Sequence, residues 1–306
     1  MGEKFMRILI TGSEGLIGRR LRAALAQGGH IALGCDIKAD APDEKGDIRR
    51  LSCLEKVAPE VDGIIHLAGV SRVIDGERDP EECMRTNAGG TKNVIKAAMA
   101  SPNRPWILFS SSREVYGDPS SLPVPDTAAL KPVNIYGESK AECERMLLDV
   151  RREGLRTGIV RLSNVYGDVK DHADRVVPAF CRAAATGGRI RVEGAQNTFD
   201  FTHVDDTARG LMALIDQLGQ RENTPPTHLV TGRGVTLEEL AKLAVQCGGS
   251  DCDIVERPSR SFDVSKFYGD PIRAEKYLGW SAKIRIEDGV KRLVADFKAA
   301  SERMVA

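Results

Sequence analysis

The 306-residue chain has no excess of charge of either sign, because 44 Lys and Arg balance 44 Asp and Glu. This balance does not favour nucleic acid as a partner, since nucleic-acid binding requires clustered basic residues. No apolar run approaches the roughly 20 residues that cross a membrane, and the N-terminal residues lack the apolar segment of a signal peptide. We therefore expect a cytoplasmic protein with neither a membrane nor a nucleic-acid partner.

The cysteines also lack the pattern of a metal site. Seven are present, an odd number, and none forms a Cys-x-x-Cys pair. Cys247 and Cys252 are five residues apart, but no His or Cys cluster beside them completes a ligand set. The sequence predicts reduced thiols and no bound metal.

Apolar residues make up 42% of the chain, enough for a sizeable core. Runs that predict strands occupy residues 6–11, 30–35, 62–69, 106–110 and 157–162. Segments with helical spacing occupy residues 16–27, 86–100 and 136–152. Strands that alternate with helices predict an α/β fold, with a doubly wound parallel sheet of the Rossmann type and right-handed crossovers.

The alternation becomes less regular after Asn164. A polar loop is expected at 168–175, and the remaining elements are three helices (176–185, 204–218 and 237–247) and three short strands (190–192, 198–203 and 228–230). Thr236 and Glu239 have the spacing of a capping box. We expect a Rossmann domain at 1–164, to which 201–230 returns. A smaller C-terminal α/β lobe at 165–200 and 231–306 would bind the substrate.

A glycine-rich loop follows the first predicted strand. Gly12, Gly15 and Gly18 have the spacing G-x-x-G-x-x-G and open a helix, whose free N–H groups and dipole hold a pyrophosphate. Asp36 ends the second strand, 18 residues after Gly18. A carboxylate there accepts hydrogen bonds from both ribose hydroxyls and repels a 2′-phosphate, so it favours NAD over NADP, although Lys38 is close by. We therefore expect the domain at 1–164 to bind NAD.

Tyr136 and Lys140 are four residues apart on a predicted helix and share one face. A phenol has an ordinary pKa of about 10, which a neighbouring ammonium and a cationic nicotinamide would lower. Ser112 ends a neighbouring strand and can hydrogen-bond the same substrate oxygen. This combination predicts proton transfer at a secondary alcohol beside a hydride carrier.

These motifs belong to an ordered set that spans nearly the whole chain. The set comprises TGSEGLIG (11–18), Asp36, GDI (46–48), HLAG (66–69), TNAGGTKNVIKAA (86–98), SSSREVYGD (110–118), YGESK (136–140), VRLSNVYGD (160–168), FDFTHVDDTARG (199–210) and KYLGW (276–280). In this order the motifs resemble those of the extended short-chain dehydrogenase/reductases, above all the nucleotide-sugar epimerases and dehydratases.

The resemblance implies a role for individual residues. Contacts to NAD are implied for Gly12, Gly15, Leu16, Ile17 and Gly18 at the pyrophosphate, Asp36 at the ribose, Asp47 and Ile48 at the adenine, and Leu67, Ala68, Gly69 and Asn87 near the active-site end of the sheet. Ser112, Tyr136 and Lys140 would form the catalytic triad, with Tyr136 and Lys140 also beside the cofactor. Asn164 would contact the sugar or its phosphates, whereas His66 and His203 would be structural.

Arg113-Glu114 is a departure from the resembled pattern. Nucleotide-sugar 4,6-dehydratases have Asp-Glu here, where the Glu removes a C5 proton and the Asp protonates the departing C6 oxygen. A guanidinium cannot serve as that acid, because its pKa exceeds about 12. Glu114 is therefore a candidate catalytic base, an ion-pair partner of Arg113, or a ligand of a sugar hydroxyl.

Phe199 is a second departure, since the resembled proteins have there an Arg that grips the substrate diphosphate. The candidates to replace it are Arg191, Arg257 and Arg260, unless the substrate has no nucleotide diphosphate. The segment 257–270 is also unlike that of the resembled proteins, and we expect it to determine substrate identity.

The leading hypothesis is an NAD-dependent nucleotide-sugar 4-epimerase. The alternatives are a lyase that uses Glu114, a dehydrogenase or reductase acting on a sugar or sugar acid, and a non-catalytic NAD-sensing protein. By analogy with the resembled proteins, helices 88–99 and 140–150 are expected to form a homodimer interface.

Overall fold

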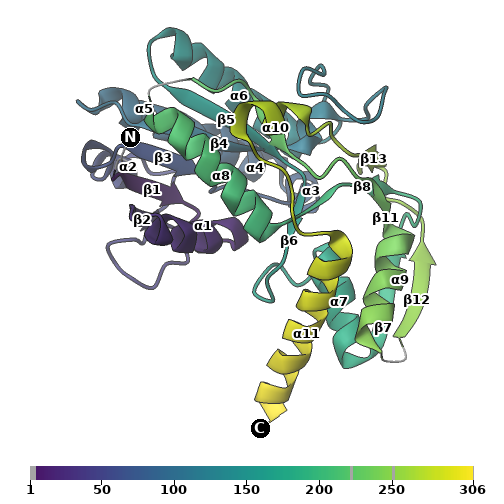
Figure 1. Cartoon of the computed structure of the whole chain (residues 1–306). Coiled ribbons are helices and arrows are strands. Elements are labelled where there is room, and N and C mark those ends of the chain that lie inside the picture. Colours follow the sequence, from purple (N-terminus) through teal and green to yellow (C-terminus); the bar gives the residue numbers. More distant parts are fainter. Residues whose placement is uncertain (1–4, 221–222, 250–251, 306) are drawn as a thin grey trace.

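The computed structural model describes residues 5–220, 223–249 and 252–305. Its main sheet has six strands in the order β10-β5-β4-β3-β1-β2, and all neighbouring pairs are parallel (Figure 1). The strands are β1 (Arg7–Thr11), β2 (Ile31–Cys35), β3 (Gly63–His66), β4 (Trp106–Ser112), β5 (Thr157–Leu162) and β10 (Thr227–Leu229). The parallel doubly wound sheet predicted from the alternation of strands and helices is confirmed.

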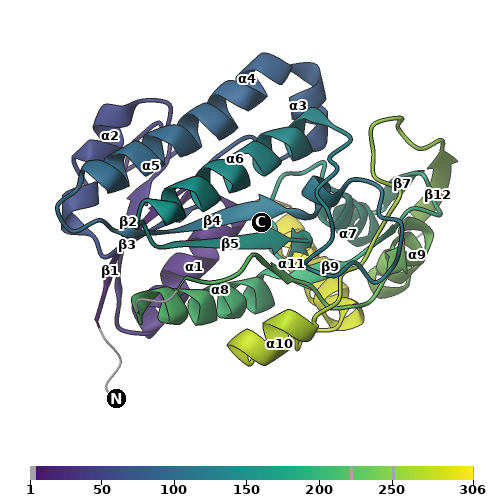
Figure 2. The same cartoon turned by 90° about the horizontal axis from the view of Figure 1, so that it is seen from above.

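Helices cover both faces of this sheet (Figure 2). On one face α5 and α6 bury Val94, Ile95 and Leu147, and on the other α1 and α8 bury Leu21 and Leu211. The helical segments of this part are α1 (Leu16–Gln27), α2 (Leu51–Glu55), η1 (Ala58–Glu60), α3 (Val73–Arg78), α4 (Pro80–Met84), η2 (Arg85–Gly89), α5 (Gly90–Ala100), η3 (Arg113–Tyr116), α6 (Ile135–Arg152) and α8 (Val204–Gly219).

The parallel register brings the carboxyl ends of the strands to one edge of the sheet. Thr11 at the end of β1 lies beside Cys35 of β2 and His66 of β3, and His66 lies beside Phe109 of β4. The glycine-rich loop, the segment after β3 and the end of β4 therefore meet at this edge, where open α/β sheets bind their ligands.

The helices α7 (Val176–Thr186), α9 (Leu237–Gly248) and α11 (Ile286–Val305) pack together around a second apolar core. Phe180, Leu240 and Val290 are buried in it. The elements of this part are β6 (Asn164–Tyr166), α7 (Val176–Thr186), β7 (Gly188–Glu193), β8 (Thr198–Phe199), β9 (Phe201–His203), β11 (Val235–Thr236), α9 (Leu237–Gly248), β12 (Cys252–Arg257), β13 (Lys266–Phe267) and α11 (Ile286–Val305). The short helix α10 (Ile272–Leu278) instead packs against β10 of the main sheet and against α8. The capping box of Thr236 and Glu239 at the start of α9 is confirmed.

The single strand predicted at 198–203 is wrong. Residue Asp200 divides it into β8, which pairs with β11 and β13, and β9, which pairs with β6. The Asp200 carboxylate is buried and accepts hydrogen bonds from the backbone of Thr231 and Gly232, so it turns away from the ladder. A buried carboxylate needs such donors, and the strand pattern could not reveal them.

Other boundaries differ from the predicted ones. The strand predicted at 106–110 continues to Ser112, the strand predicted at 62–69 is only Gly63–His66, and the helix predicted at 86–100 begins with the π-turn of η2. Short elements such as α2 and β13 were not predicted, because they are too short to show a period. Within the described ranges, no helix is long and apolar enough to cross a membrane.

Candidate active site

The glycine-rich loop is packed too tightly for any side chain at two of its glycines. Gly12 has a φ of +76°, and a Cβ there would lie 2.8 Å from the backbone nitrogen of Ala68. A Cβ at Gly18 would lie 2.3 Å from the Gly12 carbonyl oxygen. Because both obstacles are backbone atoms, the loop keeps this shape only with glycine at these positions.

The start of α1 is open to an anion. Its N-cap is Gly15, which provides no side-chain cap, and the first turn contains no acidic residue. The first N–H groups of a helix have no partner within the helix, so they are available to a pyrophosphate. Leu16 and Ile17, which the resemblance places at the cofactor, lie in this first turn.

Asp36 lies directly beside this loop. One carboxylate oxygen accepts a hydrogen bond of 2.9 Å from the Glu14 backbone N–H, and the other accepts one of 2.8 Å from the Lys38 backbone N–H. A carboxylate has about four acceptor positions, so two remain for ribose hydroxyls. This arrangement fits the NAD ribose expected at Asp36.

Asp47 and Ile48 lie on the same side of the sheet, beside α5. The Ile48 side chain is buried, and its carbonyl oxygen accepts a hydrogen bond of 2.9 Å from the Asn93 side chain. Asp47 pairs with Arg49 at 2.7 Å, and hydrogen bonding from Arg49 lowers the pKa of the Asp47 carboxyl. Packing thus holds the Ile48 side chain in place as an apolar surface, and Arg49 compensates the charge of Asp47.

Asn87 joins the segment after β3 to α6. Its side-chain oxygen accepts a hydrogen bond of 2.8 Å from the Val70 N–H, and its amide donates one of 2.8 Å to the Ser139 hydroxyl. A Cβ at Gly69 would lie 2.5 Å from the Asn87 oxygen. The chain at Leu67, Ala68 and Gly69 is therefore held against the helix that carries Tyr136 and Lys140.

Tyr136, Lys140 and Ser112 meet at the carboxyl end of β4. The Ser112 hydroxyl is hydrogen-bonded to the Tyr136 side chain, and the Lys140 ammonium donates a bond of 2.9 Å to the Ser110 carbonyl oxygen. Asn134 caps α6 by accepting a bond of 2.8 Å from the Gly137 N–H, which fixes the start of the helix. The three predicted catalytic residues are thus brought together.

Burial controls the titration of this cluster. It raises the pKa of Tyr136 to about 12, against the hydrogen bond from Ser112 and the positive charge of Arg175, both of which lower this pKa. Burial also lowers the pKa of Lys140. The expected lowering of the Tyr136 pKa by Lys140 therefore does not dominate in the protein alone, because desolvation of the phenolate outweighs the nearby positive charges.

Glu114 is buried next to this cluster, and both of its oxygens have partners. One pairs with the Arg113 guanidinium at 2.8 Å, and the other accepts a hydrogen bond of 2.9 Å from the Asn134 side chain. Of the three roles considered for Glu114, the ion pair with Arg113 is the one present in the structure.

The buried guanidinium of Arg113 lies 4.4 Å from the centre of the Phe199 ring. Its Nε atom is 3.4 Å from the side-chain oxygen of Asn164, the residue that the resemblance places at the sugar or its phosphates. The two departures from the resembled pattern, at Arg113 and Phe199, are therefore in direct contact.

The three arginines proposed to take over phosphate binding from residue 199 have exposed side chains. They lie in the part of the chain that forms the second core. Arg191 is on β7, Arg257 is on β12, and Arg260 pairs with Asp263 at 2.7 Å. None of the contacts recorded among the described residues joins these three to Ser112, Tyr136 or Lys140. A different arginine, Arg113, has the contact with Phe199.

The two histidines expected to be structural have partners that fit this role. His66 is buried between the hydroxyls of Thr11 and Thr91, at 2.7 and 3.0 Å, and burial lowers its pKa to about 3. His203 caps α8 by accepting a hydrogen bond from the Asp205 N–H. His66 is therefore neutral at physiological pH and unsuited to proton transfer there.

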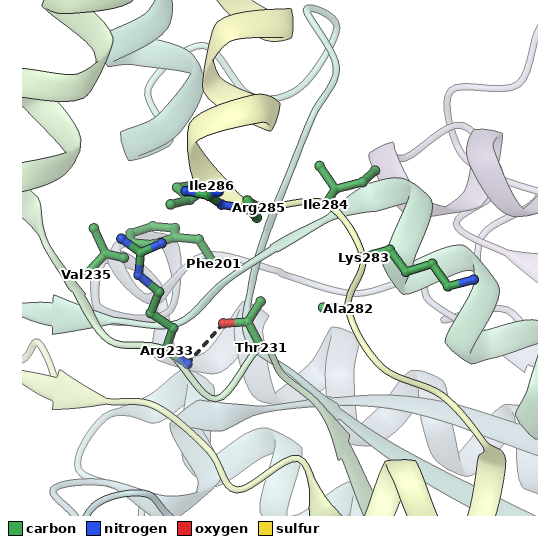
Figure 3. Close-up of a pocket in the computed structure, with 9 residues that line it drawn as sticks. All are labelled: Phe201, Thr231, Arg233, Val235, Ala282, Lys283, Ile284, Arg285 and Ile286. Carbon is green, nitrogen blue, oxygen red and sulfur yellow. Dashed lines mark hydrogen bonds between the residues drawn. The ribbon is translucent and has the colours of Figure 1, made fainter.

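A separate pocket of about 180 Å³ lies between β9 and the start of α11 (Figure 3). Its lining includes Phe201, Thr231 and Arg233, together with residues 282–286. Arg233 pairs with Glu287 at 2.7 Å, so its charge is compensated. None of the predicted catalytic or cofactor residues lines this pocket.

Sequence reasoning missed two residues next to the catalytic cluster. Asn134 had a signal, because an Asn immediately before a helix is a favourable N-cap. Arg175 had no such signal. Its side chain lies 3.1 Å from the Ser71 hydroxyl, and its positive charge lowers the pKa of Tyr136. This position depends on how the chain after β6 folds back.

A glycine loop at an open helix start, an acidic residue after β2 and a Ser-Tyr-Lys cluster after β4 together define a dinucleotide-dependent enzyme. The chain belongs to the NAD dependent epimerase/dehydratase family, whose model matches residues 8–227. Its cofactor is NAD, as the description of this family states, and the solved neighbours from Brucella ovis and Bifidobacterium longum contain NAD.

Three proteins illustrate the similarity. UDP-glucuronic acid decarboxylase 1 of Arabidopsis thaliana is 28% identical over 97% of this chain and 71% of that protein. The UDP-glucose 4-epimerase of Thermotoga maritima, solved with UDP-glucose, is 26% identical, with a TM-score of 0.86, over 97% of this chain and 100% of that one. The Brucella ovis UDP-glucose 4-epimerase with NAD is 27% identical, with a TM-score of 0.86, over 95% and 98%.

Proposed function

We propose that the protein is a nucleotide-sugar 4-epimerase in which Tyr136 is the acid and base, and Ser112 and Lys140 assist it. Residues 165–200 and 231–306 would form the substrate-binding lobe. The single observation that carries this proposal is the hydrogen bond between Ser112 and Tyr136, with the Lys140 ammonium 5.8 Å from the centre of the Tyr136 ring and both oxygens of the neighbouring Glu114 engaged. This arrangement suits proton transfer at one carbinol, whereas Glu114, the candidate base for a second proton, is engaged by Arg113 and Asn134.

In the proposed reaction Tyr136 takes the proton of the C4 hydroxyl, and Ser112 hydrogen-bonds the same oxygen. NAD, held by the glycine-rich loop and Asp36, would supply the hydride acceptor and donor for C4. After the 4-keto sugar has turned over, Tyr136 would give the proton back to the C4 oxygen, and the product would have the opposite configuration at C4. Lys140 holds its positive charge beside the phenol, and the hydrogen bond to the Ser110 carbonyl oxygen orients it. No net redox change results.

The test is proton NMR of the protein with NAD and UDP-glucose, UDP-glucuronic acid, dTDP-glucose or GDP-mannose in deuterated water. A C4 epimer without deuterium at carbon, and without net NADH, is the expected result. A net accumulation of NADH with an oxidised sugar would contradict the epimerase and favour a dehydrogenase.

A second candidate is a lyase or decarboxylase that shares the same oxidation at C4. Its specific support is Glu114, which is buried and close enough to influence the pKa of Tyr136. The similarity to a UDP-glucuronic acid decarboxylase adds to it. In the same NMR experiment, deuterium at C5 together with loss of the C6 carboxyl group or the C6 oxygen would favour this candidate.

A further inference from the structure

Arg113 is an uncommon residue to find beside a catalytic cluster, because it is both charged and buried. Only 10% of its side chain is exposed, compared with 6% for Glu114. It follows Ser112 directly, so its backbone is fixed at the end of β4 while its side chain extends toward the second core. Its charge is thus placed between the proton-transfer residues and the part of the chain expected to bind substrate.

Three groups hold the guanidinium in place. Glu114 pairs with Nη2 at 2.8 Å, the Asn164 oxygen lies 3.4 Å from Nε, and the Phe199 ring lies beneath the guanidinium carbon at 4.4 Å. The Phe267 ring adds a second aromatic surface at 5.8 Å. Aromatic faces attract a cation without using its hydrogen-bond donors, so this arrangement orients the guanidinium but leaves donors unused.

The remaining nitrogen, Nη1, is buried and has no hydrogen-bond partner among the described residues. Leaving the N–H donors of a buried charged group without acceptors is unfavourable. This indicates that an acceptor from outside the chain forms hydrogen bonds with them. Guanidinium groups bind the oxygens of carboxylates and phosphates through such paired N–H donors. A substrate anion is the acceptor that this geometry suits.

Phe199 is compatible with Arg113 in a way that a second arginine is not. A guanidinium at residue 199 would lie within a few ångströms of the first, and two buried like charges repel strongly. The Phe199 ring instead stabilises the cation that Arg113 brings to this place. The two residues therefore act as a pair: Phe199 supports the charge, and Arg113 provides it.

We propose that Arg113, oriented by Glu114 and Phe199, binds an oxyanion of the substrate through Nη1. The inference rests on the proposed nucleotide-sugar substrate and adds that an anionic group reaches Arg113. Two parts of such a substrate have the required chemistry, namely its diphosphate and a carboxylate at C6 of a uronic acid.

The experiment compares the NAD-loaded protein with its Arg113→Gln variant by calorimetric titration with UDP-glucose and with UDP-glucuronic acid. The variant is expected to bind at least one of them tenfold or more weakly. An equal loss for both ligands identifies the diphosphate as the anion, and a loss for UDP-glucuronic acid alone identifies the carboxylate. Arg152→Gln, at the exposed end of α6, is the matched control and should bind both ligands as the unmodified protein does.

Two further variants separate anion binding from a structural role of the ion pair. Glu114→Gln keeps an oxygen that can accept the Arg113 hydrogen bond and removes the negative charge that competes with the anion, so the anion should bind as tightly as before or more tightly. The double variant Arg113→Ser/Phe199→Arg moves the guanidinium to residue 199 and should recover binding if the anion is the diphosphate. If Glu114→Gln weakens binding as much as Arg113→Gln does, the pair is structural and the proposal is wrong.

Thermal-shift measurements with pyrophosphate and with glucuronate extend the test beyond nucleotide sugars. A twofold or smaller effect of Arg113→Gln on every ligand that binds, or binding of none of these anions, would overturn the proposal. Binding that depends on Arg113 without conversion of any sugar would leave the proposal standing and contradict the epimerase instead.

Discussion

The Lys140 ammonium lies 5.8 Å from the centre of the Tyr136 ring and is tied by a hydrogen bond to the end of β4. Residues four apart on a helix share one face, so α6 alone aligns the two side chains. The hydrogen bond to the Ser110 carbonyl oxygen then fixes both against the strand that ends in Ser112. Removal of the Tyr136 hydroxyl alone should therefore affect chemistry more than cofactor binding, because the ring keeps its place.

Tyr136→Phe is expected to lower kcat by about 10²- to 10⁴-fold, because the variant loses the proton donor and acceptor. The ring still fills its buried site, so the NAD dissociation constant should change little. Steady-state kinetics and a fluorescence titration with NAD measure the two effects. Turnover equal to that of the unmodified protein would exclude Tyr136 as the acid and base.

Ser112→Ala and Glu114→Gln should move the pH profile in opposite directions. The Ser112 hydrogen bond lowers the pKa of Tyr136, so its loss moves the acidic limb of kcat/KM to higher pH. The Glu114 charge raises the same pKa, so its neutralisation moves that limb to lower pH. Profiles from pH 5 to 10, with each enzyme saturated with NAD, make the comparison. Shifts of equal sign would contradict this electrostatic account.

Gly18→Ala and Gly89→Ala form a matched pair of glycine substitutions in helical backbone. A Cβ at Gly18 meets the Gly12 carbonyl oxygen at 2.3 Å, whereas a Cβ at Gly89 has nothing within 4 Å. Gly18→Ala should weaken NAD binding at least tenfold, because the loop must move. Gly89→Ala should keep NAD affinity and add roughly 0.5–1 kcal/mol of stability. NAD titration and urea unfolding check both outcomes, and equal NAD affinity for the two variants would refute the prediction.

His66 is expected to make the protein sensitive to acid. Burial lowers its pKa from 6.5 to about 3 in the folded protein, so the unfolded chain binds the proton first as pH falls. The contribution of neutral His66 to the free energy of unfolding is present above pH 6.5 and is lost progressively as the pH falls to 3. Between pH 6.5 and 5 the loss amounts to roughly 2 kcal/mol.

The matched variant for this prediction is His66→Gln, whose amide can still reach the hydroxyls of Thr11 and Thr91. Urea unfolding at pH 7.5 and at pH 5 gives the free energy of unfolding for both proteins. The unmodified protein should lose more of it than the variant, since other titrating groups are common to both. An equal loss would mean that His66 does not carry the effect.

A homodimer through the outer faces of α5 and α6 predicts a mass of about twice 33.3 kDa in light scattering after gel filtration. Arg145 is exposed on α6 and pairs with Glu142 and Asp149. Arg145→Glu gathers negative charge on this face and should weaken the dimer, while Arg303→Glu on α11 should not. A single 33 kDa species for the unmodified protein would exclude the dimer.

Local sequence was sufficient for much of the fold. The helix at Leu16–Gln27 and the strand at Thr157–Leu162 have the predicted bounds, because each has a clear apolar period and flanking residues that end it. The glycine spacing, Asp36 and the Tyr136–Lys140 pair could also be read directly, since each depends on neighbours close in the chain.

The contact between Arg113 and Phe199 could not be read in this way. The two residues are separated by 86 positions, and they meet only because β8 comes to lie beside the end of β4. The division of residues 198–203 between two sheets could not be read from the sequence either. It depends on hydrogen bonds to Asp200 from Thr231 and Gly232, which lie 31 and 32 residues further along the chain.

The sequence by itself determined the alternation of strands and helices, the NAD loop and the residues of the proton-transfer cluster. These depend on backbone preferences and on side chains within a few residues of each other. Only the tertiary structure decided the partners of Glu114, the position of Arg175 and the contact of Arg113 with Phe199. Such contacts follow from packing between distant segments, and the free energy of burying a charge depends on neighbours that the chain order does not reveal.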